Sequence, residues 1–96
     1  MPEVNRQLAA IMFTDIVGYT AMMGKDRDKA MELLKRNKEI QKPLVEKHKG
    51  NWLKEIGDGV MSTFQTASDA IDCALSVQQQ AADVEDLNLR IGIHSR

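Results

Sequence analysis

The sequence has little cysteine, little net charge and no long apolar run, and each shortage excludes a class of protein. A single cysteine, Cys73, cannot form an internal disulfide, so we expect a cytoplasmic chain in which this reduced thiol contributes to packing. Thirteen basic residues against 14 acidic residues give a formal net charge of −1, which does not favour binding to nucleic acid or to an anionic membrane. No stretch has the length and hydrophobicity of a signal peptide or a membrane span, so we expect no membrane segment.

The length limits the architecture to one small domain, which we place at residues 1–96. The chain contains no repeat, linker or low-complexity tract that would divide it. Any chemistry must therefore take place on a single sheet and the loops around it.

The first half of the chain predicts one strand and one long helix. Residues 8–15 are apolar at consecutive positions, which is typical of a central strand covered on both faces. Residues 26–49 have apolar positions at helical spacing, with charges between them, and Asp26 or Asp28 could cap the start of this helix.

Two features near the end of the helical pattern should limit it. Pro43 is expected to kink or interrupt the helix near Ile40, because proline removes a backbone hydrogen bond and its ring clashes with the preceding turn. His48-Lys49-Gly50 is typical of a helix end.

The second half of the chain predicts a hairpin, a helix and a last strand. Residues 51–56 and 60–65 are short strand-like runs, and the sequence Gly57-Asp58-Gly59 between them permits a tight turn. A capping signature at Thr66 starts a second main helix, and apolar alternation over residues 89–94 predicts the final strand.

The order strand, helix, strand, strand, helix, strand predicts an α+β fold, the ferredoxin-like split βαβ sandwich, with two helices on one face of an antiparallel sheet. The first strand and the strand at 51–56 would be parallel members of one right-handed crossover unit, so both run toward the same end of the sheet. This topology predicts that Asp15 and Asp58 meet there.

These two carboxylates are candidate metal ligands, although each also has a simpler explanation. Asp58 could be an ordinary turn residue, and Asp15 could cap a short helix that starts near Gly18. Two carboxylates at one sheet edge repel each other unless a cation lies between them, which favours a divalent metal.

Two further features could recognise a nucleotide. The loop Gly18-Tyr19-Thr20 leads into a helical segment at residues 21–23, and helix starts present free N–H groups to phosphate. Lys54 lies among apolar strand neighbours, where it is either an exposed edge lysine or a group that recognises a ligand.

The apolar first strand also predicts a partner. Ala9, Ala10, Ile11, Met12 and Phe13 place apolar groups on both faces of the strand, yet two helices can cover only one face of the sheet. An uncovered apolar face implies association with another protein surface.

Three ordered segments together resemble the class III adenylate and guanylate cyclase catalytic domain. They are residues 13–20 (FTDIVGYT), residues 54–61 (KEIGDGVM) and residues 90–95 (RIGIHS). The similarity extends from about Arg6 to Ser95, which is nearly the whole chain.

The resemblance implies a reaction in which the ribose 3′-hydroxyl of a nucleoside triphosphate attacks the α-phosphate and pyrophosphate leaves. It implies two divalent ions, Mg²⁺ or Mn²⁺, held by Asp15, Asp58 and the backbone carbonyl of Ile16. The implied contacts to the phosphates come from Val17, Gly18, Tyr19 and Thr20. Lysine at position 54, where the family senses the purine, resembles the adenylate cyclases and implies ATP rather than GTP as the substrate.

The resemblance also implies that the site is incomplete within these 96 residues. The family's second base-contacting residue and its Asn and Arg pair lie beyond the His-Ser motif, and Arg96 stands where glycine usually follows. We therefore expect a metal-binding, N-terminal part of the domain that is nearly inactive alone, because loss of such transition-state contacts costs about 10² or more in rate. Family active sites lie between two cyclase domains, so a homodimer or a paired cyclase domain is the expected partner.

Two other functions remain open from the sequence. The chain could be a catalytically silent module that binds nucleotide or dimerises. It could also belong to another metal-dependent nucleotidyl transfer enzyme, which would bind divalent metal but form no cyclic product.

Overall fold

A computed structural model describes residues 10–95. Its elements follow in the order β1 (Ala10–Ile16), α1 (Tyr19–Lys25), α2 (Arg27–Lys47), β2 (Asn51–Ile56), β3 (Gly59–Phe64), α3 (Ala67–Ala81) and β4 (Leu89–Ser95). The strands form one sheet in the order β2-β3-β1-β4, in which every neighbouring pair is antiparallel. This confirms the predicted split βαβ sandwich, to which α1 adds a short third helix.

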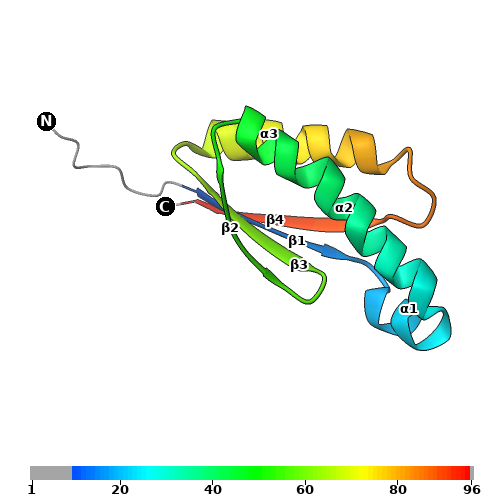
Figure 1. The fold of residues 1–96 in the computed structure, drawn as a ribbon. Helices are drawn as coiled ribbons and strands as arrows, with labels where there is room; N and C mark the ends of the chain where they lie inside the picture. The colour runs from blue at the N-terminus through cyan, green and yellow to red at the C-terminus, as the bar shows by residue number, and fades with distance from the viewer. Residues whose placement is uncertain (1–9, 96) are drawn as a thin grey trace, which may run out of the picture.

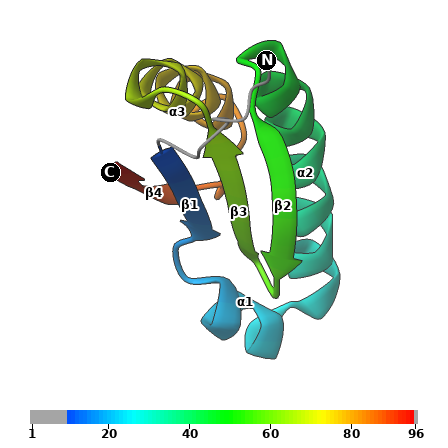
Figure 2. The ribbon, with the colours of Figure 1, turned by 90° about the vertical axis from the view of Figure 1, so that its left-hand side faces the viewer.

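The long helices lie on one side of the sheet. In Figure 1, α2 and α3 cover the same face, and no described helix covers the opposite face, which we call the outer face. Figure 2 shows that the end of β1 and the turn between β2 and β3 lie at the same end of the sheet, next to α1. None of the helices within residues 10–95 is both long and apolar enough to cross a bilayer.

Burial alternates along β1. Ala10, Met12 and Ile16 point toward the helices and are almost fully buried, whereas Phe13 points to the outer face and is 43% exposed. Within residues 10–95, β1 is therefore covered on one face only, because α2 and α3 pack on the same side of the sheet. The prediction that both faces of this strand are covered was wrong for this part of the chain.

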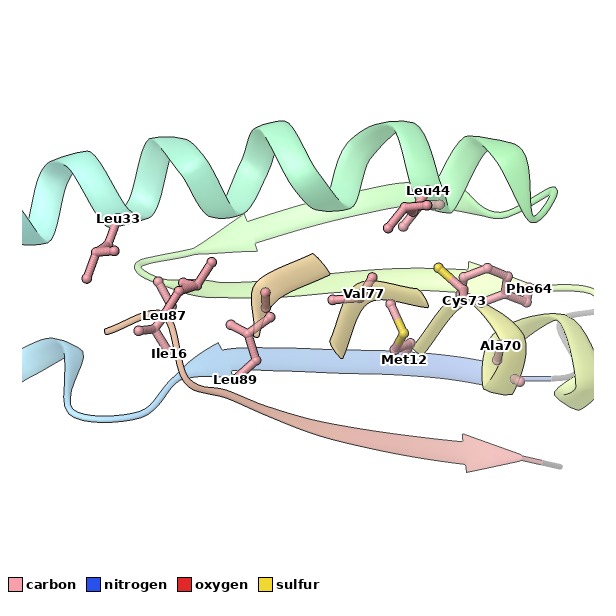
Figure 3. Packing of buried hydrophobic residues seen from close by; sticks show 13 residues of the cluster. Met12, Ile16, Leu33, Leu44, Phe64, Ala70, Cys73, Val77, Leu87 and Leu89 are labelled. Atoms are coloured by element: carbon pink, nitrogen blue, oxygen red, sulfur yellow. The ribbon is translucent and has the colours of Figure 1, made fainter. Parts of the chain in front are cut away.

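The core fills the space between the helices and the sheet. Figure 3 shows Leu33 of α2 pointing toward the end of the core that contains Ile16 and Leu87, and Leu44 lying near Cys73 and Phe64 at the other end. Cys73 is fully buried, and burial raises the pKa of its thiol to about 11, which agrees with the predicted packing role.

Helix α2 starts where the sequence predicted. The Asp26 carboxylate accepts a hydrogen bond from the Lys29 N–H at 3.1 Å and so caps the first turn. The predicted interruption near Ile40 was wrong, because α2 continues through Pro43 to Lys47. Pro43 lies on the exposed side of α2, so water can reach the carbonyl that has lost its partner, and buried residues before and after it hold both parts of the helix on the sheet.

The second half of the chain also follows its sequence closely. The Thr66 hydroxyl accepts a hydrogen bond from the Asp69 N–H at 3.0 Å at the start of α3, as the capping signature predicted. The strands of the hairpin and β4 lie within one residue of their predicted bounds.

A polar contact lies inside the core between α2 and β1. The side-chain amide of Gln41 donates to the Thr14 hydroxyl at 3.0 Å and to the Asn37 side-chain oxygen at 2.7 Å. All three side chains are at least 97% buried. We call these residues the buried polar trio.

Candidate functional site

The ends of β1 and of the β2–β3 hairpin are joined by a hydrogen bond. The backbone N–H of Ile16 donates to Oδ2 of Asp58 at 2.7 Å. Thr14 pairs with Val60 at the end of the β1–β3 ladder. If the same register continued by two residues, Ile16 would stand opposite Asp58. A carboxylate therefore occupies the place of a ladder carbonyl, and the two strand ends meet as the topology predicted.

Asp15, the neighbouring residue on β1, pairs with Arg90 of β4. One guanidinium nitrogen of Arg90 lies 3.1 Å from each carboxylate oxygen of Asp15. Only Oδ2 accepts a well-directed hydrogen bond, and the buried Oδ1 accepts none. Since the Arg90 side chain is 70% exposed, solvent screens this ion pair.

The oxygen atoms at these strand ends suit a hard divalent cation. Oδ1 of Asp15 is buried without a hydrogen bond, and the Ile16 carbonyl points to the same side of β1 as the N–H that contacts Asp58. No group of three or more His, Cys, Asp or Glu side chains within residues 10–95 could hold a metal by itself. Mg²⁺ does not require such a group, because it is usually bound by one or two carboxylates, with water and substrate phosphate as its remaining ligands. The residues therefore fit the metals that the resemblance implies.

The loop after β1 turns sharply into α1. Gly18 has φ +78° and occupies the N-cap position without any side-chain cap, so Asp15 does not cap this helix. The N–H of Val17 donates to the Asn88 carbonyl at 2.8 Å and fixes the loop against the segment before β4. The N–H groups of Tyr19 and Thr20 in the first turn have no partner within the helix.

A hollow on the outer face brings Lys54 to the same place as Asp15. Its volume is about 200 Å³, and its lining includes Phe13, Asp15, Lys54, Ile56, Gly59 and Met61. This is below the range of roughly 300–1,000 Å³ that is typical of ligand sites. The hollow by itself is therefore too small to enclose a typical ligand.

A larger hollow, of about 620 Å³, runs along the exposed side of α2. It is lined by Lys35, Lys38, Glu39, Lys42, Pro43 and Glu46, and it shares no residue with the hollow that contains Asp15 and Lys54. Because it is a shallow surface of alternating charges without paired carboxylates, we do not assign the chemistry to it.

Sequence reasoning missed two contacts at this site. The pair between Arg90 and Asp15 could have been found, because the predicted topology places the last strand beside the first and the alternation of β4 puts Arg90 on the outer face. The hydrogen bond between Trp52 and Glu55, on the face of β2 opposite to Lys54, could not be predicted from the sequence. It depends on a shift in the register of β2 between Trp52 and Lys54.

The sequence of this chain is similar to a known protein family over nearly its whole length. The family model described as "Adenylate and Guanylate cyclase catalytic domain" matches residues 2–95. A curated protein of Rhizobium meliloti (strain 1021), named "Putative adenylate cyclase 3", is 40% identical over 100 residues, which cover 96% of this chain and 17% of that protein.

Solved structures show the same likeness. A bacterial light-regulated adenylyl cyclase has a TM-score of 0.80 at 26% identity, over 91% of this chain and 53% of that chain. An adenylate/guanylate cyclase/hydrolase from Silicibacter pomeroyi has a TM-score of 0.76 at 32% identity, over 91% of this chain and 55% of that chain. The chain thus spans about half the length of these solved chains and less than a fifth of the curated relative.

Proposed function

The chain belongs to the adenylate and guanylate cyclase catalytic domain family, and on this basis we propose that it is the metal-binding part of an adenylate cyclase. The reaction is the conversion of ATP into 3′,5′-cyclic AMP and pyrophosphate for intracellular signalling, which we assign to the cytoplasm. The observation that carries this proposal is that Asp15 and Lys54 line one hollow, beside the turn that holds Asp58.

Asp15 and Asp58, with the carbonyl of Ile16, are the residues that would hold two divalent ions, Mg²⁺ or Mn²⁺. When bound, such ions lower the pKa of the ribose 3′-hydroxyl and neutralise the triphosphate and the leaving pyrophosphate. The buried Oδ1 of Asp15, which accepts no hydrogen bond, supports this role. Arg90 neutralises part of the charge of Asp15 and has to yield that oxygen to a cation.

The loop from Val17 to Thr20 is assigned to the triphosphate. Gly18 has the positive φ that turns the chain toward the first turn of α1, where the N–H groups of Tyr19 and Thr20 are free to donate. Val17 contributes by anchoring this turn through its bond to Asn88.

Lys54 is assigned to the purine. A lysine ammonium only donates hydrogen bonds, and N1 of adenine accepts one, whereas N1 of guanine carries a hydrogen. Lysine at this position therefore favours ATP over GTP.

A second cyclase domain, from a homodimer or a paired chain, is assigned to the outer face. Phe13 is 43% exposed and Ile56 is 65% exposed there, although both are apolar. The hollow between them is too small for a nucleotide by itself, so a partner that covers the apolar surface would also complete the site.

The residues that stabilise the transition state are assigned to parts of the natural protein outside this segment, since the solved relatives are nearly twice as long. A polypeptide limited to residues 1–96 should therefore form cyclic AMP at least about 10²-fold more slowly than the full-length protein.

The test is cyclic nucleotide formation by the purified full-length protein with ATP and Mn²⁺ or Mg²⁺. The wild type should form cyclic AMP and Asp15→Ala should not, while Asp72→Ala, which removes an exposed carboxylate of α3, should match the wild type. Cyclic AMP formation by Asp15→Ala would reject the assigned site. Nucleotide binding without any cyclic product from the wild type would instead support the silent module, which the neutralisation of Asp15 by Arg90 also fits.

A further inference from the structure

Strand β2 contains a bulge immediately before Lys54. Asn51 pairs with Thr63 and Trp52 with Ser62, but the next pair joins Lys54 to Met61. Leu53 is the extra residue, without a partner on β3. Because side chains alternate between the faces of a strand, one extra residue moves every later side chain to the opposite face.

The bulge determines which face carries Lys54. In an unbroken register Leu53 would pair with Met61 and Lys54 with Val60, whose side chain is buried beneath the helices. In the observed register Lys54 pairs with Met61 on the outer face and lines the hollow with Asp15. Without the bulge Lys54 would point away from this hollow.

The same shift turns Glu55 toward α2. Figure 2 shows β2 running alongside α2. Oε2 of Glu55 accepts a hydrogen bond from Nε1 of Trp52 at 3.1 Å and lies 3.1 Å from Nζ of Lys38 on α2. Nζ of Lys42 lies 5.8 Å from the centre of the Trp52 ring. We call Lys38, Trp52 and Glu55 the β2 clamp.

The hydrogen bond between Trp52 and Glu55 depends on the bulge. Residues three apart in a regular strand point to opposite faces and cannot join their side chains. Here they point to the same side, so the bond forms only in the bulged conformation and stabilises it. The Trp52 N–H and the Lys38 ammonium also lower the pKa of Glu55, since both favour the ionised carboxylate.

From this geometry we infer that the β2 clamp holds the bulge that presents Lys54 to the purine base, so that Glu55 is a positioning residue for nucleotide selectivity. This inference rests on the proposed function, because it requires Lys54 to recognise the base. Glu55 itself faces away from the hollow and acts only through the strand.

The test is the ratio of kcat/KM for ATP to kcat/KM for GTP, measured on the full-length protein for Glu55→Gln and for Lys38→Met. Each variant should lower the ratio about fivefold, which corresponds to an exposed ion pair of about 1 kcal/mol. Glu39→Gln is the matched control, because Glu39 is an exposed glutamate of α2 outside the clamp. It should leave the ratio unchanged, and melting temperatures should show that all the variants are folded.

The same substitutions in a Lys54→Ala protein separate positioning from a general structural effect. If the clamp acts through Lys54, Glu55→Gln should have no further effect on the ratio once Lys54 is absent. An equal effect with and without Lys54 would overturn the inference, as would an unchanged ratio in Glu55→Gln.

These failures differ from failure of the proposed function. An active wild type that loses selectivity in Lys54→Ala but not in Glu55→Gln would reject the clamp alone. A wild type that forms no cyclic nucleotide would reject the proposed function, and the clamp inference with it.

Discussion

One guanidinium nitrogen of Arg90 lies 3.1 Å from both carboxylate oxygens of Asp15, across the β1–β4 pair. A cation of the protein thus occupies the carboxylate to which we assign a metal ion. The position of Arg90 is fixed by the register, which pairs it directly with Asp15.

Replacing this arginine should strengthen metal binding. In Arg90→Gln the competing charge is gone, so the affinity for Mn²⁺ should rise about fivefold, which corresponds to an exposed ion pair of about 1 kcal/mol. Electron paramagnetic resonance of free Mn²⁺ measures this affinity directly. Arg36→Gln, on the exposed side of α2, is the control and should bind as the wild type does. Unchanged or weaker binding in Arg90→Gln would show that Arg90 does not compete with the ion for Asp15.

Two substitutions of Asp58 should separate its contact with Ile16 from its assigned contact with metal. Asp58→Asn keeps a side-chain oxygen that can accept the Ile16 N–H, so its stability should be close to that of the wild type while metal binding is lost. Asp58→Ala loses both the contact with Ile16 and the metal ligand. Its free energy of unfolding should be about 1–3 kcal/mol lower than that of the wild type, which is the cost of leaving a buried donor unpaired. Urea denaturation and metal titration measure the two effects. Metal binding by Asp58→Asn at wild-type affinity would exclude this carboxylate as a ligand.

Lys54→Glu should reverse the donor and acceptor character that faces the base. A carboxylate accepts hydrogen bonds, so it suits the N1–H of guanine and repels the acceptor at N1 of adenine. In the full-length protein the preference for ATP over GTP should fall at least about tenfold, and competition assays with both nucleotides measure this ratio. Lys35→Glu, a matched change on α2, should leave it unaltered. Equal selectivity in wild type and Lys54→Glu would discard the assignment of Lys54 to the base.

The single tryptophan gives a direct measure of the β2 clamp as the pH changes. The bond from Trp52 and the ion pair with Lys38 hold the pKa of Glu55 below its ordinary value of 4.5. The contact should therefore contribute its full stability above pH 4.5 and lose it as the pH falls through the lowered pKa. Lys38 and Lys42 are the cations near this carboxylate.

Fluorescence of Trp52 in the folded chain should consequently change in a single step below pH 4.5. Glu55→Gln, which cannot titrate, should lack this step, and circular dichroism recorded in parallel shows that the chain stays folded. The same step in both proteins would mean that another group controls the environment of Trp52.

The sequence predicted the features that depend on neighbouring residues. The cap at Thr66 depends on Asp69 three residues later, and the tight turn depends on the glycines around Asp58. The meeting of the end of β1 with the turn that carries Asp58 followed from the order of elements, which sequence patterns indicated, and from the general handedness of the crossover.

Features that depend on packing between distant segments were not predictable in the same way. The bulge at Leu53 is held by contacts between β2 and α2, and no local pattern in β2 announces it. The interruption predicted at Pro43 was wrong because the free-energy cost of a proline in a helix depends on its surroundings. The carbonyl one turn earlier loses its partner, and the sequence does not show whether water can reach that carbonyl.

The buried polar trio has a consequence for how the site could respond to the rest of the protein. Sliding of α2 along the sheet would break the bond from the Gln41 amide to Thr14, while the bond to Asn37 lies within α2 and would remain. One buried N–H of the amide would then lack a partner, which costs about 1–3 kcal/mol. Thr14, which receives this bond, immediately precedes Asp15 on β1. This bond links α2 to the strand that carries Asp15, so we expect a displacement of α2 to shift the Asp15 carboxylate as well.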